Sequence, residues 1–268
     1  MKKCLKVLFF LVVTVLCFSN EKEIRLKLAT TTSTENSGLL GYLLPEFKKD
    51  SGITVDVISV GTGKAIKLGE NGDVDVVLVH ARALEDKFVS DGFGVKRYDL
   101  MYNDFVILGP KKDKLNLKKQ KNAADVFKLI ANKGATFISR GDESGTHVKE
   151  KEIWKSINIT PEGKWYKEAG MGMEEVINMA NQQQGYTLAD RGTYLSMKNK
   201  IDLVICYEGD KILFNPYGVI AVNPEKQPHT QIEAANKFIE WLISEKGQKL
   251  IGSYKVGGEV LFFPDAKK

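Results

Sequence analysis

Three short segments of this sequence combine small hydroxyl-bearing residues with the predicted start of a helix. They are Thr30–Thr34, Gly61–Gly63 and Ser139–Thr146, and each follows an apolar run that predicts a strand. A helix N-terminus presents unpaired backbone N–H groups and a partial positive charge, so it attracts anions. Serine and threonine hydroxyls add further donors. The same residue types are also ordinary helix caps, so each segment by itself fits capping as well as anion binding.

Arg140 makes the third segment the most informative of the three. It precedes the run Ser144-Gly145-Thr146 by four residues, and an arginine guanidinium is the usual side chain for pairing with an oxyanion. The three segments together therefore predict a cradle of hydrogen-bond donors for a small oxyanion. Binding of this kind requires no covalent chemistry.

A catalytic interpretation of the third segment is the alternative from another class of protein. It is a secreted hydrolase or transferase that uses Ser144 and His147. These two residues are three apart and would share one helical face, but no carboxylate is evident to orient the histidine. The three histidines have no metal-ligand spacing, so no metal site is predicted. His80 ends an apolar strand, where ligands of open α/β sheets bind, and it is either a ligand contact or a structural histidine.

Strand-like and helical patterns alternate along the chain. Ile24–Thr30, Val55–Val60 and Val74–Val79 predict strands, and apolar residues at helical spacing predict helices at Ser37–Asp50 and Thr62–Leu68. Strand, helix and strand at this pace indicate parallel βαβ units. The later part of the chain predicts a strand from Phe105–Leu108, a helix between Asn122 and Gly134, a strand at Thr136–Ser139, a helix at Thr146–Ile157, strands at Ile201–Cys206 and Tyr217–Val222, and one final helix at Thr230–Tyr254.

The N-terminus has the pattern of a secretory signal. Three lysines precede the apolar run Val7–Phe18, which is too short for a comfortable membrane span, and Ser19 offers a small residue for cleavage. Residues 1–19 are therefore predicted to be a signal peptide. A lipid anchor on Cys17 is the alternative, although Leu16 before it fits a lipoprotein cleavage site poorly.

The charge balance argues against nucleic acid as a partner. The full chain carries 39 Lys and Arg against 34 Asp and Glu, a net charge of +5. Without the three lysines of residues 1–19 the excess falls to about +2, which does not argue for a nucleic-acid-binding surface. The composition, 43% hydrophobic and 27% charged, is that of an ordinary globular protein.

These motifs, in this order, resemble the tungstate-binding receptors of bacterial ABC importers. The similarity extends over essentially the whole chain after residue 19, and the runs are long enough to be specific. The matching runs are Ala29–Thr34, Ser37–Leu40, Val60–Ala65, Asp75–Ala81, Met101–Phe105, Ser139–His147, Tyr186–Leu195 and Glu208–Asp210.

The resemblance implies an α/β, two-lobed periplasmic-binding-protein fold of type II, in which each lobe is a mixed sheet flanked by helices and two crossing strands form the hinge. It implies a first lobe of residues 20–101 and 218–268 and a second lobe of residues 102–217. The implied protein is a receptor and not an enzyme, which captures tungstate between the lobes and delivers it to an ABC transporter permease. It is expected in the periplasm as a monomer, peripheral to the membrane through the permease, with no cofactor and no metal beyond tungsten as oxyanion.

The oxyanion contacts that the resemblance and the three cradles imply come from both lobes. Tyr186 and Arg191 are further candidates, and pairing with an acid is the structural alternative for Arg191. The remaining expected contacts are Thr31, Thr32, Ser33, Thr62, His80, Arg140, Ser144, Gly145 and Thr146.

A more distant likeness to phosphate receptors of the same superfamily bears on the ligand. Those receptors share an arginine followed by Ser-Gly-Thr, matched here by Arg140 and Ser144–Thr146. They also carry an aspartate that accepts the proton of hydrogen phosphate, and by local pattern His80 takes its position. A site without that carboxylate neither needs a protonated ligand nor repels a dianion. Tungstate is therefore expected, and molybdate, sulfate or phosphate is the alternative for a receptor of this fold.

Overall fold

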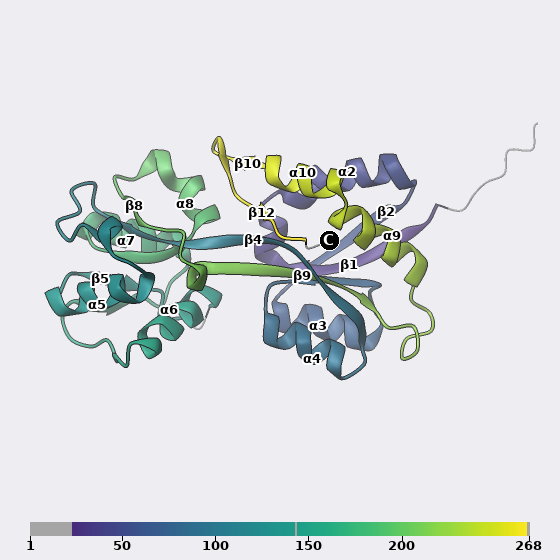
Figure 1. Ribbon diagram of the computed structural model, residues 1–268, viewed down its shortest axis with the longest axis horizontal. Helices are drawn as coiled ribbons and strands as arrows, with labels where there is room; N and C mark the ends of the chain where they lie inside the picture. The colour runs from purple at the N-terminus through teal and green to yellow at the C-terminus, as the bar shows by residue number, and fades with distance from the viewer. Residues whose placement is uncertain (1–22, 143, 267–268) are drawn as a thin grey trace, which may run out of the picture.

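The computed structural model describes residues 23–142 and 144–266. Its helices and strands form two groups along the long axis of the molecule (Figure 1). Two long strands, β4 (Gly94–Gly109) and β9 (Phe214–Val222), pass between the groups and pair with each other in antiparallel fashion. The predicted signal peptide and Cys17 lie outside the described residues.

The first group is built around the parallel strands β1 (Arg25–Thr31), β2 (Thr54–Val60) and β3 (Val76–Val79). The sheet order is β12-β4-β9-β3-β1-β2, in which β12 (Phe263–Pro264) and β9 run antiparallel to their partners. The predicted βαβ units are present. The helices of this group are α1 (Thr32–Asn36), α2 (Leu39–Ser51), α3 (Thr62–Asn71), α4 (Arg82–Ser90), α9 (Ile232–Ile243) and α10 (Glu245–Ser253).

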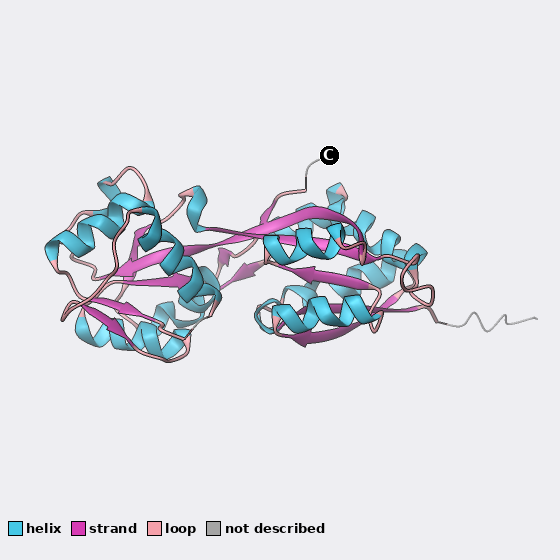
Figure 2. Cartoon of the chain, turned by 90° about the horizontal axis from the view of Figure 1, so that it is seen from below, coloured by secondary structure: helices cyan, strands magenta, loops and turns pink. Residues whose placement is uncertain are grey.

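Both faces of this sheet are buried, as Figure 2 shows by the helices on either side. Successive side chains of a strand point to opposite faces. Val76 and Leu78 accordingly pack with the apolar residues of α2 and α9, whereas Val77 and Val79 pack with those of α3 and α4. Burial on both faces explains the unbroken apolar run of β3, which is typical of parallel strands.

The second group surrounds the other end of β4. Strands β7 (Thr187–Asp190) and β8 (Val204–Tyr207) pair with β4, and β5 (Phe137–Ser139) pairs with β6 (Tyr166–Glu168). The same alternation divides its core, since Phe105 and Ile107 lie in one apolar cluster and Val106 and Leu108 in another. The helices here are α5 (Ala123–Lys133), α6 (Gly145–Ser156), α7 (Met173–Gln183) and α8 (Arg191–Met197).

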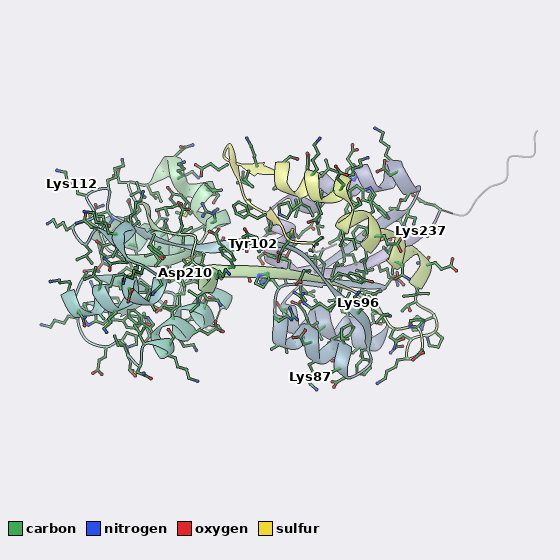
Figure 3. The ribbon with its side chains drawn as sticks, viewed as in Figure 1. Lys87, Lys96, Tyr102, Lys112, Asp210 and Lys237 are labelled. Carbon is green, nitrogen blue, oxygen red and sulfur yellow. The ribbon has the colours of Figure 1, made fainter. Side chains whose placement is uncertain are left out.

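Aromatic rings pack where the two long strands leave the first group. Tyr102 of β4 stacks on Phe214 of β9 with 4.5 Å between ring centroids, and on Phe263 of β12 with 5.2 Å. Figure 3 places Tyr102 near the middle of the molecule, between the two groups. The remaining short elements are η1 (Leu117–Lys119), η2 (Lys198–Lys200), η3 (Lys211–Leu213), β10 (Lys255–Val256) and β11 (Glu259–Val260).

Local signals in the sequence located some helix ends correctly. Asn122 caps α5 by accepting a hydrogen bond from the Asp125 amide at 2.7 Å. Gly134 ends the same helix with a φ of 58°, a conformation that glycine adopts without steric cost. Both predicted ends of α5 are therefore confirmed.

One prediction about a longer element was wrong, and another was confirmed but too short. The single C-terminal helix expected at Thr230–Tyr254 is two helices, because Ser244 adopts an extended conformation and caps α10 by accepting from the Gly247 amide at 3.2 Å. The strand expected from Phe105 is only the far part of the 16-residue β4. None of the helices within the described ranges combines the length and apolar character that a membrane crossing requires.

Candidate functional site

A cavity of about 550 Å³ lies between the two groups of elements and is lined by residues from both. The two long strands β4 and β9, called the hinge strands from here on, form part of its wall. They contribute Asn103, Phe105, Asn215 and Tyr217. Such a position between lobes is a common place for small-ligand sites. Six of the predicted site residues line this cavity: Ser33, His80, Arg140, Ser144, Gly145 and Thr146.

The end of β1 supplies the first-group side of the cavity. Thr31 is buried and caps α1, and its hydroxyl lies 3.1 Å from Ser33 Oγ and 2.6 Å from Thr34 Oγ1. Thr31 thus holds Ser33 at the cavity wall without lining the cavity itself. Thr32 is exposed in the first turn of α1. The predicted Thr-Thr-Ser segment is therefore present, with a single direct cavity contact.

His80 lies beside these hydroxyls, one residue after β3. Its Nε2 atom is 3.3 Å from Thr31 Oγ1 and 3.4 Å from Ser33 Oγ, and its Nδ1 atom is 3.2 Å from Asn215 Oδ1. Burial lowers the pKa of His80, and the hydrogen bond with Asn215 offsets part of that effect. The imidazole is therefore neutral at pH 7.

Thr62 lies at the start of α3 and is not brought to the cavity. The helix cap is Gly61, and Thr62 is half-buried. This segment keeps the predicted form of a helix start, but in the observed arrangement Thr62 does not line the cavity and makes no side-chain cap.

The second-group side of the cavity carries a permanent positive charge. The Arg140 guanidinium pairs through Nη2 with Asp142, whose other oxygen accepts from the Ser144 amide at 3.2 Å. Arg140 Nε is buried and has no hydrogen-bond partner among the described residues. An unpaired buried donor costs about 1–3 kcal/mol, so this N–H is suited to a further acceptor.

Ser144, Gly145 and Thr146 begin helix α6 at the cavity. Ser144 caps the helix, because its hydroxyl accepts from the His147 amide at 3.3 Å. The imidazole of His147 points elsewhere, with Nε2 3.9 Å from Glu168 Oε1. Ser144 is therefore placed as a helix cap, and the geometry offers no support for the Ser144–His147 nucleophile of the hydrolase alternative.

Neither Tyr186 nor Arg191 lines the cavity, although Asp190 and Gly192 on either side of Arg191 do. The Tyr186 hydroxyl donates to Asp113 Oδ1 at 2.7 Å within the core of the second group. Arg191 donates to both oxygens of Asp104 at 2.6 Å and to Glu208 at 2.6 Å. These hydrogen bonds raise the pKa of Arg191 further above its usual range. The acid pairing considered for Arg191 is thus present, and both side chains have structural partners.

Sequence reasoning missed a chain of amides on the hinge strands. Asn103 and Asn215 face each other across β4 and β9, and Asn215 Nδ2 donates to Asn103 Oδ1 at 2.9 Å. Asn103 Nδ2 donates to the Tyr217 hydroxyl at 3.2 Å. The signal available in the sequence was the amide side chain of Asn103, two residues before the apolar run that begins at Phe105.

It also missed two carboxylates in the cavity wall. Asp190 lines the cavity and caps α8, where it accepts from the Thr193 amide at 2.8 Å. Glu174 lines the cavity from α7 and is exposed. The predicted contacts are all donors, but the cavity as a whole also contains acceptors.

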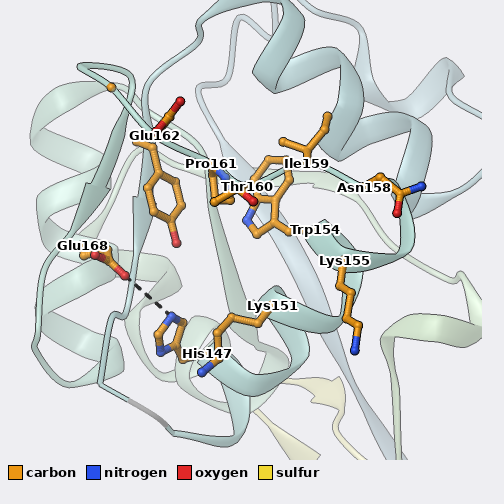
Figure 4. A pocket seen from close by; sticks show the side chains of 12 residues that line it. His147, Lys151, Trp154, Lys155, Asn158, Ile159, Thr160, Pro161, Glu162 and Glu168 are labelled. Atoms are coloured by element: carbon orange, nitrogen blue, oxygen red, sulfur yellow. Dashed lines mark ion pairs between the residues drawn. The ribbon is translucent and has the colours of Figure 1, made fainter.

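A second cavity, of about 910 Å³, lies wholly within the second group (Figure 4). His147 and Lys151 from α6 line it together with Trp154 and Glu168. It contains none of the predicted site residues, so its larger volume does not make it the better candidate for the predicted oxyanion. Within residues 23–142 and 144–266, no group of three or more His, Cys, Asp or Glu side chains is placed to hold a metal ion.

Comparisons with known proteins agree with this architecture. The model of the PBP superfamily domain matches residues 20–246. The tungstate-binding protein TupA of Peptoclostridium acidaminophilum is 52% identical over 245 residues, which cover 90% of this chain and 86% of that protein.

Two solved structures are also similar over nearly their whole length. The tungstate-binding protein TupA from Desulfovibrio alaskensis G20 superposes with a TM-score of 0.87 at 49% identity, covering 91% of this chain and 100% of that one. The tungstate ABC transporter structure from Geobacter sulfurreducens has a TM-score of 0.73 at 60% identity and covers 86% and 98%.

Proposed function

This chain belongs to the PBP superfamily, within the family of the TupA proteins, and from that membership we propose that it captures tungstate in the cavity between its lobes and delivers it to an ABC transporter permease. The expected periplasmic-binding-protein fold is confirmed by the match to the D. alaskensis structure. The protein is a receptor and not an enzyme, as expected from its relatives.

The observation that carries the proposal is the polar lining of the cavity between the lobes. Arg140 contributes a positive charge and a buried N–H without a partner, and Ser144–Thr146 present the N-terminus of α6. Ser33 faces them from the other lobe. A tetrahedral oxyanion would accept hydrogen bonds from both sides at once, which holds the two lobes together around it.

Closure of the lobes is part of the proposed mechanism. We take residues 20–101 and 218–268 as the first lobe and 102–217 as the second, so that both boundaries fall within the hinge strands β4 and β9. Thr32 and Thr62 lie outside the lining of the cavity and would reach the ion only if the lobes moved closer. Thr31 would act through Ser33, which it holds by a hydrogen bond.

The ligand is a dianion in this proposal. His80 stands where the phosphate receptors are expected to carry a proton-accepting aspartate, and Asp190 is engaged with the start of α8. Tungstate therefore fits the site better than hydrogen phosphate, and molybdate is the closest alternative.

The proposed setting follows from the same family. The receptor would act as a monomer in the periplasm, secreted by a signal peptide at residues 1–19 and peripheral to the membrane through the permease. The permease would recognise the closed form, in which both lobes present a continuous surface. A lipid anchor at Cys17 is the alternative form of attachment.

Isothermal titration calorimetry of the mature chain with tungstate, molybdate, sulfate and phosphate tests this proposal. The expected result is saturable binding of tungstate to one site per chain, with no turnover of the ligand. Failure of all four anions to bind would overturn the assignment. Tight binding of sulfate or phosphate with weak binding of tungstate would retain the fold and replace the ligand.

A further inference from the structure

The cavity offers an oxyanion less positive charge than its donor groups suggest. Among the described residues that line it, Arg140 has the one permanent positive charge, and the Asp142 carboxylate pairs with it. Glu174 and Asp190 add two carboxylates to the lining. A dianion would therefore meet more negative than positive side-chain charge, which opposes its binding in a site partly shielded from water.

His80 is the other described lining side chain that can gain a positive charge near neutral pH. Its Nε2 atom faces the Thr31 and Ser33 hydroxyls at 3.3 and 3.4 Å. These are long separations for hydrogen bonds, so neither hydroxyl holds Nε2 tightly. A proton on Nε2 would point toward the part of the wall that Ser33 contributes to the cavity.

The opposite ring nitrogen is held by the amides of the hinge strands. His80 Nδ1 lies 3.2 Å from Asn215 Oδ1, while Asn215 Nδ2 donates to Asn103 and Asn103 Nδ2 donates to Tyr217. Because both amide nitrogens are used as donors, Asn215 Oδ1 is left to accept, and the hydrogen of the neutral ring lies on Nδ1. Nε2 is therefore the nitrogen that receives the next proton.

We propose that His80 takes up a proton from solvent at Nε2 when the oxyanion binds, so that tungstate binding and protonation of His80 are coupled. This inference rests on the proposed function of the cavity. The dianion supplies the opposite charge that stabilises the imidazolium. The imidazolium in turn offsets part of the negative charge of the cavity wall, and the ligand gives up no proton.

The immediate surroundings of His80 keep the ring neutral before binding. Thr31 and Ser33 face it from β1 and α1, and Asn215 and Tyr217 face it from β9, with the Tyr217 ring centroid 4.7 Å away. None of these is charged, since burial raises the pKa of Tyr217 above its usual value. Burial likewise lowers the pKa of His80.

The charged side chains of the cavity act on His80 in opposite directions. Arg140 disfavours the imidazolium, whereas Glu174 and Asp190 favour it, and no hydrogen bond joins any of the three to the described ring atoms. An added dianion shifts this balance toward the protonated ring. Affinity should therefore rise as the pH falls through the pKa of His80 in the complex, and level off below its pKa in the free protein.

Calorimetry in two buffers of different ionisation enthalpy measures this proton directly. Tungstate should be titrated into the mature chain at several pH values between about 6.5 and 8.5, a window that begins at the ordinary pKa of histidine and extends above it. The observed enthalpy should differ between buffers in the direction of net proton uptake. The association constant should increase by up to about tenfold for each unit by which the pH falls.

The three histidines of the chain provide matched variants. His80→Gln retains an amide that can reach the Nε2 position but cannot be protonated, so uptake should disappear and affinity should no longer depend on pH. His229→Gln is the control, because His229 Nε2 contacts the Gly72 carbonyl and does not line the cavity. His147→Gln tests the histidine of the other cavity, and both controls should retain the wild-type uptake.

Nitrogen NMR of wild-type protein labelled at histidine gives a second readout that does not depend on a variant. Addition of tungstate should shift His80 from a neutral ring protonated on Nδ1 to an imidazolium. Tungstate binding without proton uptake would overturn this inference and leave the proposed function standing. Uptake that persists in His80→Gln would also overturn it. Absence of tungstate binding in the wild type would instead overturn the proposed function.

Discussion

The two walls of the cavity differ in the chemical groups that they present to a ligand. The second-lobe wall combines a charged guanidinium, the Asp142 carboxylate beside it and the start of a 12-residue helix, α6. The first-lobe wall is neutral at pH 7, and its polar groups include hydroxyls and the imidazole of His80, which the hinge amides hold in place. The difference indicates that the permanent positive charge comes from one lobe, while the other supplies orientation and a connection to the hinge.

The two arginines of the second lobe, Arg191 and Arg140, differ in how many of their hydrogen-bond donors are used within the protein. Arg191 satisfies three hydrogen bonds with Asp104 and Glu208, whereas Arg140 makes one ion pair and keeps its buried Nε without a partner among the described residues. A buried arginine whose donors are saturated serves the fold. One that retains an unused donor at a cavity wall is the better candidate for a ligand.

The largest effect is expected from Arg191→Ala, and it should be an effect on folding. Arg191 and Asp104 are buried, at 9% and 4% exposed. Removal of one partner of a buried ion pair leaves an uncompensated charge and costs about 3–5 kcal/mol of unfolding free energy. Urea denaturation measures the loss. The double variant Arg191→Leu with Asp104→Leu should recover part of it, and an unchanged midpoint in Arg191→Ala would remove the distinction between the two arginines.

Arg140→Ala should weaken tungstate binding and leave the fold intact. Truncation of one partner of a buried, hydrogen-bonded charge pair costs about 2–5 kcal/mol, so tungstate affinity should fall roughly 30-fold to several thousandfold. Arg140→Lys should recover only part, because an ammonium cannot make the two-pronged contact. Calorimetry gives the affinities, with circular dichroism as the folding control. Binding within about threefold of wild type, a change of about 0.65 kcal/mol, would move the anion site elsewhere.

The choice of ligand should reflect the absence of a carboxylate among the first-lobe residues that line the cavity. Tungstate should bind at least about 100-fold more tightly than phosphate at neutral pH, a difference of about 2.7 kcal/mol. Competitive titration at fixed pH measures the ratio. Similar affinities for the two anions would mean that a carboxylate of the cavity, such as Asp190, accepts the proton of hydrogen phosphate.

The two serines of the walls should separate capping from ligand binding. Ser144→Ala removes both the cap of α6, worth about 1 kcal/mol of stability, and a hydroxyl of the site. Ser33→Ala removes an exposed hydroxyl inside the first turn of α1, so stability should hardly change. Each variant should weaken binding by up to about tenfold, the value of one hydrogen bond. Equal melting temperatures for the two variants would contradict the capping role of Ser144.

The smallest effect should be a pH dependence of the unliganded protein that comes from the first-lobe wall. Burial lowers the pKa of His80 in the folded state, so the unfolded chain binds more protons once the pH falls below the ordinary value. The unfolding free energy should therefore fall as the pH drops from about 7.5 toward the folded pKa, with the onset near the ordinary value of about 6.5. Urea denaturation of wild type and His80→Gln should show a smaller fall in the variant.

The local parts of the site were accessible to sequence reasoning. A strand that ends in small hydroxyl residues before a helix is specified by neighbours in the chain. Ser33, Arg140 and Ser144–Thr146 could therefore be selected from the sequence, and they line the cavity, while their contact with an oxyanion stays a prediction. The caps of α5 follow the same logic, since Asn122 and Gly134 act within three or four residues. Capping and turn geometry depend on residues within a few positions of one another, so they can be predicted from the sequence.

Contacts between residues that are far apart in the sequence could be identified only from the tertiary structure. Arg191 and Asp104 are 87 positions apart, and Asn215 and Asn103 are 112 apart. Nothing in the neighbourhood of these residues identifies their partners, because the pairing of β4 with β7 and with β9 depends on the register of the folded sheet. The placement of Thr62 outside the cavity was equally hidden, since its segment has the same local signature as those that line it.

The sequence by itself determined the α/β class, because apolar periodicity and helix starts are local properties. The receptor family came from the resemblance of its motifs to tungstate-binding receptors. The tertiary structure decided which arginine keeps a buried donor without a described partner and which carboxylates share the cavity with it. It also joined His80 to the hinge through Asn215. These are properties of the distances between chain segments, and such distances exist only once the sheet has formed.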